Sequence, residues 1–409
     1  MKTILVIADG LGGRPSDANG KTCLEAADTP VLNRYGREGS VGLMDSIKPG
    51  VIPGSDTAHL SIFGYDPHSY YTGRGVYEAA GIGMEVKRGD VCFRTNFATL
   101  NEEGEIADRR AGRIQSGQEE LERALSDLHH PNYEDIKVEF KTSTEHRGAL
   151  LLRGDNLGGN VSDTDPHELG VVPPECRAFD DRSKKTAEVI NEVMVQARDI
   201  LSSHSLNKER EKQGKPPANV LLCRGAAEYP EIPSVQQKYG IEASVTAAGA
   251  LYIGVAKICG MEFKPAEGAT GTLDSNIKNK AKVGLEELKK GKDLAFLHFK
   301  GTDNASHDHD SEGKIKFIEK IDRTFAWLED NLDWSDTHLA FAGDHTTPIE
   351  FGEHVADPVP VLIRGPNLIK DGVERFDERS CASGGLGRFS GRLLPMLLSY
   401  SNLGKKFGA

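Results

Sequence analysis

The sequence predicts an α/β fold, in which a doubly wound, mostly parallel sheet carries an inserted, smaller α+β domain. Three observations predict it. Short apolar runs alternate with helical patterns at both ends of the chain. In the middle this alternation gives way to three strand-like runs around a single helix. Acidic residues lie just past the ends of three of the apolar runs, which is where open parallel sheets bind their ligands.

The first part of the chain predicts strand, helix and strand in turn. An apolar run predicts a strand at 3–8, and a helix is expected near 22–38. Pro30 interrupts that helix, because proline cannot continue one. A second strand is expected at 40–45. Ser55 and Asp56 then precede a short helical run, where such residues usually cap the helix.

The pattern changes near residue 85. We expect strands at 91–100, 137–142 and 148–153 and a helix near 116–129. The core domain would then comprise 1–85 and 182–409. The insertion would cover 86–181, with a C-terminal boundary that the pattern leaves open as far as 215. The charged stretch 208–217 is expected to be a linker.

Strands and helices alternate again after residue 218. Helix 313–329 carries apolar residues on one stripe, which predicts a helix that packs on the core. The expected elements are a helix at 182–203, a strand at 219–223, helices at 243–260 and 275–290, a strand at 294–299, a helix at 313–329, strands at 338–343 and 359–363, and a helix near 390–400.

Length and charge limit the function further. The chain has 409 residues, enough for two domains. Its 50 Lys+Arg and 62 Asp+Glu give a formal net charge of −12, which argues against nucleic acid or an anionic membrane as partners. No apolar run approaches the roughly 20 residues of a membrane span, and no signal peptide is expected because Asp9 ends the first run. Six scattered cysteines without a C-x-x-C pair indicate a cytoplasmic protein. The oligomeric state is not readable.

Seven residues form a candidate dinuclear metal site. Carboxylate and imidazole groups from rigid elements are suitable ligands for divalent ions, and two ions would use about this many. Each residue alone has an ordinary explanation, as a helix cap, a turn or a surface side chain. The combination is informative because the residues follow several strands at the same end. The candidate ligands are Asp9, Ser55, Asp303, His307, Asp344, His345 and His354.

Ser55 is also a candidate nucleophile. The start of a helix favours a bound phosphate, since free N–H groups and the helix dipole point at it. A metal ion on the serine oxygen would lower its pKa and activate it. The alternative is a capping serine without chemistry. Lys300 lies between two motif elements and is a candidate for neutralising phosphate charge, with a surface lysine as the alternative.

The insertion is rich in arginine, which suits binding of a phosphate or carboxylate. Asp163 and Asp165 lie in a polar, proline-bounded segment that is either a substrate loop with an acid/base group or a simple turn. The candidate substrate-binding residues are Arg94, Asn96, Arg109, Arg110, Arg113, His146, Arg147, Asp163 and Asp165.

Several motifs together resemble one family over the full length of the chain. They include Ala8-Asp-Gly-Leu-Gly-Gly13, Pro53-Gly-Ser-Asp-Thr-Ala58, Lys300-Gly-Thr-Asp303 and Gly343-Asp-His345. The sequence resembles the archaeal-type, cofactor-independent phosphoglycerate mutases of the alkaline phosphatase superfamily. The resemblance implies one metal ion on Asp9, Ser55, Asp344 and His345, and a second on Asp303, His307 and His354. It also implies that no 2,3-bisphosphoglycerate is needed. Oxygen and imidazole ligands suit manganese, zinc and cobalt alike, and manganese is the first expectation.

The same resemblance implies an isomerase. The enzyme would interconvert 3-phosphoglycerate and 2-phosphoglycerate through a phosphoserine on Ser55, as a step of glycolysis and gluconeogenesis. Its partner would be this small substrate. Other activities stay open, namely a homoserine kinase-like phosphotransferase, a phosphatase or another phosphomutase. All would use the same metal site, so the insertion decides between them.

Overall fold

The computed structural model describes residues 1–406 and 408, and the chain forms two compact units. The core unit comprises Met1–Tyr70 and Ile232–Ala409, and the inserted unit comprises Tyr71–Glu231. The inserted unit is wider than the expected 86–181. It gains α5 (Gly75–Gly81) on one side, because this helix packs on β3 (Val91–Leu100). On the other side it gains β7 (Val220–Glu228), because this strand pairs with β3.

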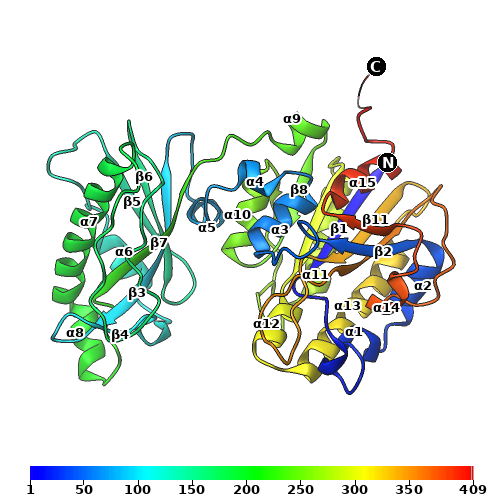
Figure 1. The fold of residues 1–409 in the computed structure, drawn as a ribbon, viewed down its shortest axis with the longest axis horizontal. Coiled ribbons are helices and arrows are strands. Elements are labelled where there is room, and N and C mark those ends of the chain that lie inside the picture. Colours follow the sequence, from blue (N-terminus) through cyan, green and yellow to red (C-terminus); the bar gives the residue numbers. More distant parts are fainter. Residues whose placement is uncertain (407, 409) are drawn as a thin grey trace. The chain divides into compact units, whose positions relative to one another are not determined.

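The core unit is built on an eight-stranded sheet in the order β13-β2-β12-β11-β1-β10-β8-β9 (Figure 1). The five strands from β11 to β9 run parallel, whereas β12 is antiparallel to both of its neighbours. The sheet is therefore mostly parallel, as the sequence predicted. The strands are β1 Lys2–Ala8, β2 Ser40–Asp45, β8 Ala243–Thr246, β9 Glu262–Phe263, β10 Leu294–Phe299, β11 Thr337–Gly343, β12 Val359–Arg364 and β13 Gly387–Ser390.

Helices cover the sheet, and the central strands are buried. Along β1, Ile4, Val6 and Ala8 pack in one cluster with residues of α2, α11 and α13. Leu5 and Ile7 point to the opposite face and are buried as well. The helices of this unit are α1 Cys23–Ala26, α2 Pro30–Glu38, α3 Ser55–Ile62, α4 Pro67–Tyr70, α9 Val235–Tyr239, α10 Ala250–Ile258, α11 Ile277–Lys289, α12 Gly301–His307, α13 Ser311–Asn331, α14 Glu378–Cys381 and α15 Leu393–Tyr400.

Local structure differs from the sequence-based expectation at several points. The helix expected near 22–38 is two helices, and Pro30 is the first residue of the second. The helix expected at 243–260 begins as a strand, because Ala243–Thr246 pairs with β10, and the helix starts only after Gly249. The expected linker at 208–217 is partly the helix α8 (Ser205–Lys212). Gly54, not Ser55, is the N-cap of α3.

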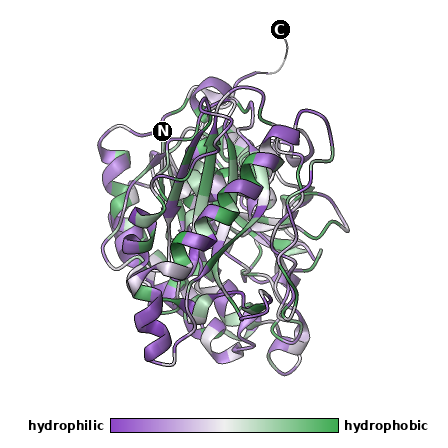
Figure 2. Ribbon diagram, turned by 90° about the vertical axis from the view of Figure 1, so that its left-hand side faces the viewer, coloured by the Kyte–Doolittle hydropathy of each residue, from purple (hydrophilic) through white to green (hydrophobic). Residues whose placement is uncertain are grey.

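The inserted unit is an antiparallel sheet with helices. Its cluster of buried residues joins α7 to the face of the sheet that carries Phe93 and Phe97. Figure 2 shows hydrophobic and hydrophilic residues alternating along the helices, as expected for helices with one buried face. Besides α5, α8, β3 and β7, the elements are β4 Ile106–Asp108, α6 Gln118–Ala124, β5 Lys137–Thr142, β6 Arg147–Arg153 and α7 Lys184–Ser203. Within the described residues, no helix is long and apolar enough to cross a membrane.

Candidate metal centre and anion cluster

Three parallel strands bring the acidic residues of the core unit to one edge of the sheet. Ala8 at the end of β1 pairs with Phe299 at the end of β10 and with Gly343 at the end of β11. The chain therefore continues from all three strands at the same level, into Asp9, Lys300 and Asp344. The loop after β1 is tight at Gly10, where φ is +63° and a Cβ would lie 3.0 Å from the Asp303 Cα.

The first group of candidate ligands surrounds the His345 ring. Its Nε2 lies 3.1 Å from Asp9 Oδ1, 3.3 Å from Ser55 Oγ and 3.5 Å from Asp344 Oδ2. The other oxygen of Asp344 accepts a hydrogen bond from the Gly10 N–H at 3.0 Å. Asp9, Asp344 and His345 are all buried, and their ligand atoms are close enough together to hold one metal ion.

The second group surrounds Asp303. Its Oδ1 lies 3.2 Å from His307 Nε2 and 3.7 Å from His354 Nε2. The Nδ1 atoms of both histidines face backbone carbonyls, those of Gly352 at 2.7 Å and Pro53 at 2.9 Å. Each Nδ1–H therefore donates to its carbonyl, and each Nε2 lone pair is directed at the carboxylate.

This arrangement fits divalent cations. Three buried carboxylate oxygens have no hydrogen-bond donor, and they are Asp9 Oδ1, Asp344 Oδ2 and Asp303 Oδ1. Each lies beside a histidine Nε2. Buried acceptors that face one another are unfavourable unless a proton or a metal ion lies between them. A metal ion displaces such a proton when it binds, so the same geometry suits either a proton or a metal ion.

The pKa values reflect this crowding of negative charge. Burial, together with the neighbouring Asp9, raises the pKa of Asp344 to about 8. Burial opposes protonation of His345, but Asp344 and Asp9 outweigh it and raise its pKa to about 9. Without a metal ion the cluster therefore retains protons at neutral pH, because full ionisation of its buried carboxylates is unfavourable.

Lys300 contacts both groups. Its ammonium donates to Asp9 Oδ2 at 3.3 Å, to Asp303 Oδ2 at 2.6 Å and to the Tyr252 hydroxyl at 3.0 Å. Burial opposes its charge, yet the carboxylates of Asp9 and Asp303 hold its pKa well above the usual value. Lys300 is thus a partly buried cation held by residues of both groups, and not a free surface lysine.

Three residues of the core unit were missed by sequence reasoning. His59 lies one helical turn after Ser55, and its Nδ1–H donates to the Ser55 carbonyl at 2.6 Å. That spacing was a usable signal. His298 is inside β10, with its Nε2 3.7 Å from Asp9 Oδ2, and Tyr252 is on α10. Neither carried a signal, because a strand interior and an ordinary apolar helix predict only core packing.

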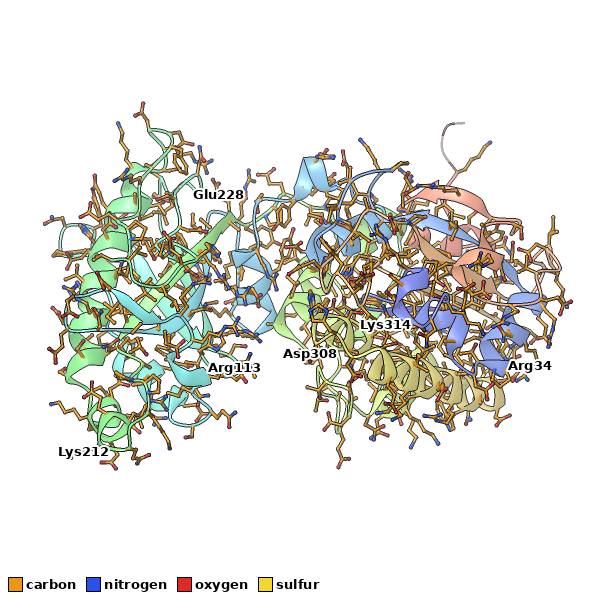
Figure 3. The ribbon with its side chains drawn as sticks, turned by 60° about the horizontal axis from the view of Figure 1, so that its bottom comes forward. Arg34, Arg113, Lys212, Glu228, Asp308 and Lys314 are labelled. Carbon is orange, nitrogen blue, oxygen red and sulfur yellow. The ribbon has the colours of Figure 1, made fainter. Side chains whose placement is uncertain are left out.

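The inserted unit gathers arginines around His146. Burial and four arginines lower the pKa of His146 to about 4. Arg94 lies on β3 opposite Arg224 of β7, and burial lowers the pKa of Arg94 to about 9. The Nε atoms of both guanidinium groups are buried without a hydrogen-bond acceptor. The four arginines near His146 are Arg94, Arg110, Arg113 and Arg147, of which Arg113 is labelled in Figure 3.

The remaining sequence candidates differ from this cluster. Arg109 forms a bidentate pair with Asp165 at 2.8 and 2.7 Å, so both groups already have a partner. Asp163 accepts from the Gly225 N–H at 2.8 Å, and its other oxygen lies 3.8 Å from His167 Nε2. Asn96 lies in β3 opposite Arg147, with its Oδ1 buried and unbonded. Arg224 was missed because its place beside Arg94 depends on the pairing of two distant strands.

Known proteins resemble the chain over its whole length. Residues 36–207 match the family model described as 2,3-bisphosphoglycerate-independent phosphoglycerate mutase. A protein of that name from Ignicoccus hospitalis is 47% identical, over 100% of this chain and 99% of its own length. The chain belongs to this family. A phosphoglycerate mutase from Methanothermobacter thermautotrophicus is 42% identical over 100% of both chains.

Solved structures confirm the predicted fold class. A protein from Pyrococcus horikoshii superposes with a TM-score of 0.87 at 39% identity, over 100% of this chain and 99% of its own. The cofactor-independent phosphoglycerate mutase from Thermoplasma acidophilum gives 0.74 at 36% identity, over 98% and 100%. Phosphoglycerate mutases are isomerases, so the predicted family and enzyme class are both confirmed.

Proposed function

We propose that this phosphoglycerate mutase family member interconverts 3-phosphoglycerate and 2-phosphoglycerate in the cytoplasm, without 2,3-bisphosphoglycerate, as a step of glycolysis and gluconeogenesis. The observation that carries the proposal is the position of Ser55. Its Oγ lies 3.3 Å from His345 Nε2, beside buried carboxylate oxygens that have no donor. A hydroxyl in such a setting is suited to nucleophilic catalysis.

In this proposal the core unit holds two divalent ions. Asp9, Ser55, Asp344 and His345 would bind one, and Asp303, His307 and His354 the other. Manganese is our first choice, because oxygen and imidazole ligands suit it, with zinc and cobalt as alternatives. When bound, the ions supply positive charge that lowers the pKa of the serine hydroxyl and neutralises the phosphoryl oxygens.

Ser55 then acts as the nucleophile. The Ser55 hydroxyl gives up its proton as its Oγ forms a bond to the phosphorus of 3-phosphoglycerate, the bond from phosphorus to O3 breaks, and O3 takes up a proton. The phosphoserine lies in the first turn of α3, where the helix dipole favours its negative charge. The O2 hydroxyl of glycerate loses a proton and attacks the phosphorus of the phosphoserine. The bond from phosphorus to Oγ breaks and Oγ takes up a proton, which gives 2-phosphoglycerate and restores Ser55.

The inserted unit would bind the glycerate portion. Arg94 and Arg224 each have a buried Nε without an acceptor, so their guanidinium groups are suited to a carboxylate. Arg110, Arg113, Arg147, His146 and Asn96 would complete this anion site. For the hydroxyl proton we propose Asp163 in preference to Asp165, since both oxygens of Asp165 already accept from Arg109. Arg109 would then position Asp165.

A direct assay tests the proposal. Purified protein is incubated with Mn²⁺ and 3-phosphoglycerate, with no bisphosphoglycerate present, and 2-phosphoglycerate is measured by an enolase-coupled assay. We expect turnover, and acid-quenched samples should contain phosphoserine at Ser55 by mass spectrometry. Release of phosphate and glycerate would identify a phosphatase instead. ATP-dependent phosphorylation of homoserine, with no mutase turnover under Mn²⁺, Zn²⁺ or Co²⁺, would identify a kinase.

A further inference from the structure

The Lys300 ammonium has no free hydrogen-bond donor. An ammonium group carries three N–H donors. Asp9 Oδ2, Asp303 Oδ2 and the Tyr252 hydroxyl oxygen accept one each, at 3.3, 2.6 and 3.0 Å. Lys300 therefore cannot bind a phosphoryl oxygen directly without losing one of these partners.

In these contacts Asp9 and Asp303 each use only one of their two carboxylate oxygens. Oδ2 of Asp9 and Oδ2 of Asp303 both face Lys300. Their Oδ1 atoms face histidine Nε2 atoms and have no donor. Asp9 belongs to the first group of candidate ligands and Asp303 to the second, so one ammonium orients a carboxylate in each.

Tyr252 holds this ammonium in place. Its ring stacks on His298 with centroids 3.7 Å apart and planes 20° apart, and the residue is buried. The His298 carbonyl in turn accepts a hydrogen bond from the buried Lys280 ammonium at 2.9 Å. The phenol is thus fixed by packing on β10, the strand that leads directly into Lys300.

We infer that Tyr252 is a positioning residue of the metal centre. It holds the Lys300 ammonium between Asp9 and Asp303, so that one oxygen of each carboxylate is turned toward a metal ion. This inference rests on the two-metal site of the proposed function. Outer partners of metal ligands typically change metal affinity by about 10- to 100-fold when removed. A single hydroxyl on α10 would then control the affinity of both ions.

The test compares two tyrosine variants in the absence of substrate. Metal-free protein is titrated with MnCl₂, and free Mn²⁺ is measured from its electron paramagnetic resonance signal. Tyr252→Phe keeps every charge and removes only the hydroxyl, so we expect weaker binding at both sites, by about tenfold. Tyr65→Phe is the matched control, because the buried Tyr65 hydroxyl donates to the Pro233 carbonyl at 2.8 Å and contacts no candidate ligand.

A second variant keeps the inference falsifiable if Tyr252→Phe is unstable. Lys300→Arg preserves the charge, but a planar guanidinium cannot place one nitrogen between both carboxylates and the phenol, so we also expect weaker Mn²⁺ binding. Melting temperatures with chelator present should be similar for the two Tyr→Phe variants. Wild-type Mn²⁺ affinity in Tyr252→Phe or Lys300→Arg would overturn the inference. Loss of mutase turnover with unchanged Mn²⁺ affinity would also overturn it. Because no substrate is used, this result is independent of whether the mutase activity is found.

Discussion

The core unit contains a cluster of acidic residues, and the inserted unit contains a cluster of arginines. In the core unit, Asp9, Asp303 and Asp344 each leave one carboxylate oxygen without a donor. In the inserted unit, Arg94 and Arg224 each leave a guanidinium nitrogen without an acceptor. Burying a charge is unfavourable unless it is compensated, so the first cluster is suited to cations. In the second cluster Glu78 lies 3.8 Å from Arg94 Nε and Asp165 lies 3.6 Å from Arg224 Nη1, so its positive charge is already partly compensated, and the nitrogens without an acceptor are suited to a further anion.

The clusters also differ in how they are built. The acidic cluster follows the ends of three neighbouring parallel strands, and His307 at the end of α12 and His354 in a loop complete it. The arginine cluster combines Arg94, Arg147 and Arg224 on antiparallel strands with Arg110 and Arg113 from the segment after β4, and Arg94 lies in the middle of β3. Rigid strand ends suit metal ions, which need fixed ligands, whereas long arginine side chains suit an anion of variable shape.

The largest expected effect comes from the nucleophile. Ser55→Ala removes the oxygen that would carry the phosphoryl group, so mutase activity should fall by roughly 10⁴-fold or more. The enolase-coupled assay measures this loss. Ser61→Ala on the same helix is the control and should remain active. Residual turnover of Ser55→Ala near the wild-type rate would show that another group accepts the phosphoryl.

The second-largest expected effect tests whether the acidic cluster of the core unit binds metal ions. Asp303→Asn removes the charge from the group with His307 and His354, so the metal content should fall from two ions to one per chain. Activity should fall by about 100-fold or more. Elemental analysis and the coupled assay measure both quantities. The control is Asp308→Asn, an exposed residue one turn further on that is labelled in Figure 3.

The third-largest expected effect tests whether the arginine cluster of the inserted unit binds an anion. Arg94→Met should reduce kcat/KM by about 10- to 100-fold, because a charge-assisted hydrogen bond contributes about 1.5–3 kcal/mol. The stability of the substrate-free protein should change little, because removal of a desolvated guanidinium with a lowered pKa offsets the loss of its ion pair with Glu78 at 3.8 Å. Steady-state kinetics and thermal unfolding test the two parts. Arg88→Met, an exposed arginine paired with Glu231, should change neither.

The sequence was more informative for the acidic cluster than for the arginine cluster. Asp9 and Asp344 directly follow apolar runs and Asp303 comes shortly after one, and parallel strands bring their carboxyl ends together, so local patterns predicted a common edge. Arg224 comes beside Arg94 only through the pairing of β3 with β7, and no local pattern encodes such pairing. For the same reason, the expected insertion boundary at 181 omitted β7.

Tyr252 illustrates a different limit. Its helix was expected, although with an early start, but nothing in an apolar helix marks one tyrosine as a partner of a lysine on another element. Ser55 and Lys300 carried local signals, a helix start and a position between motifs. Local sequence patterns therefore identify site residues whose position depends on their own helix or strand. They do not identify residues that reach the site only through tertiary contacts.

The smallest effect concerns the pH response of the arginine cluster. His146 has a pKa of about 4 in the folded protein, because it is buried and surrounded by arginines, against about 6.5 when unfolded. The folded state thus favours neutral His146. This contribution to stability is complete above pH 6.5 and is lost as the pH falls toward 4, by at most about 3 kcal/mol.

An anion bound to the arginines offsets their charge, so saturating 3-phosphoglycerate should raise the His146 pKa by about one unit. Histidine NMR titration measures this shift, with the exposed His129 as the control. An unchanged His146 pKa would show that the anion binds away from this cluster. The inserted unit would then not be the anion-binding counterpart of the cation-binding core unit.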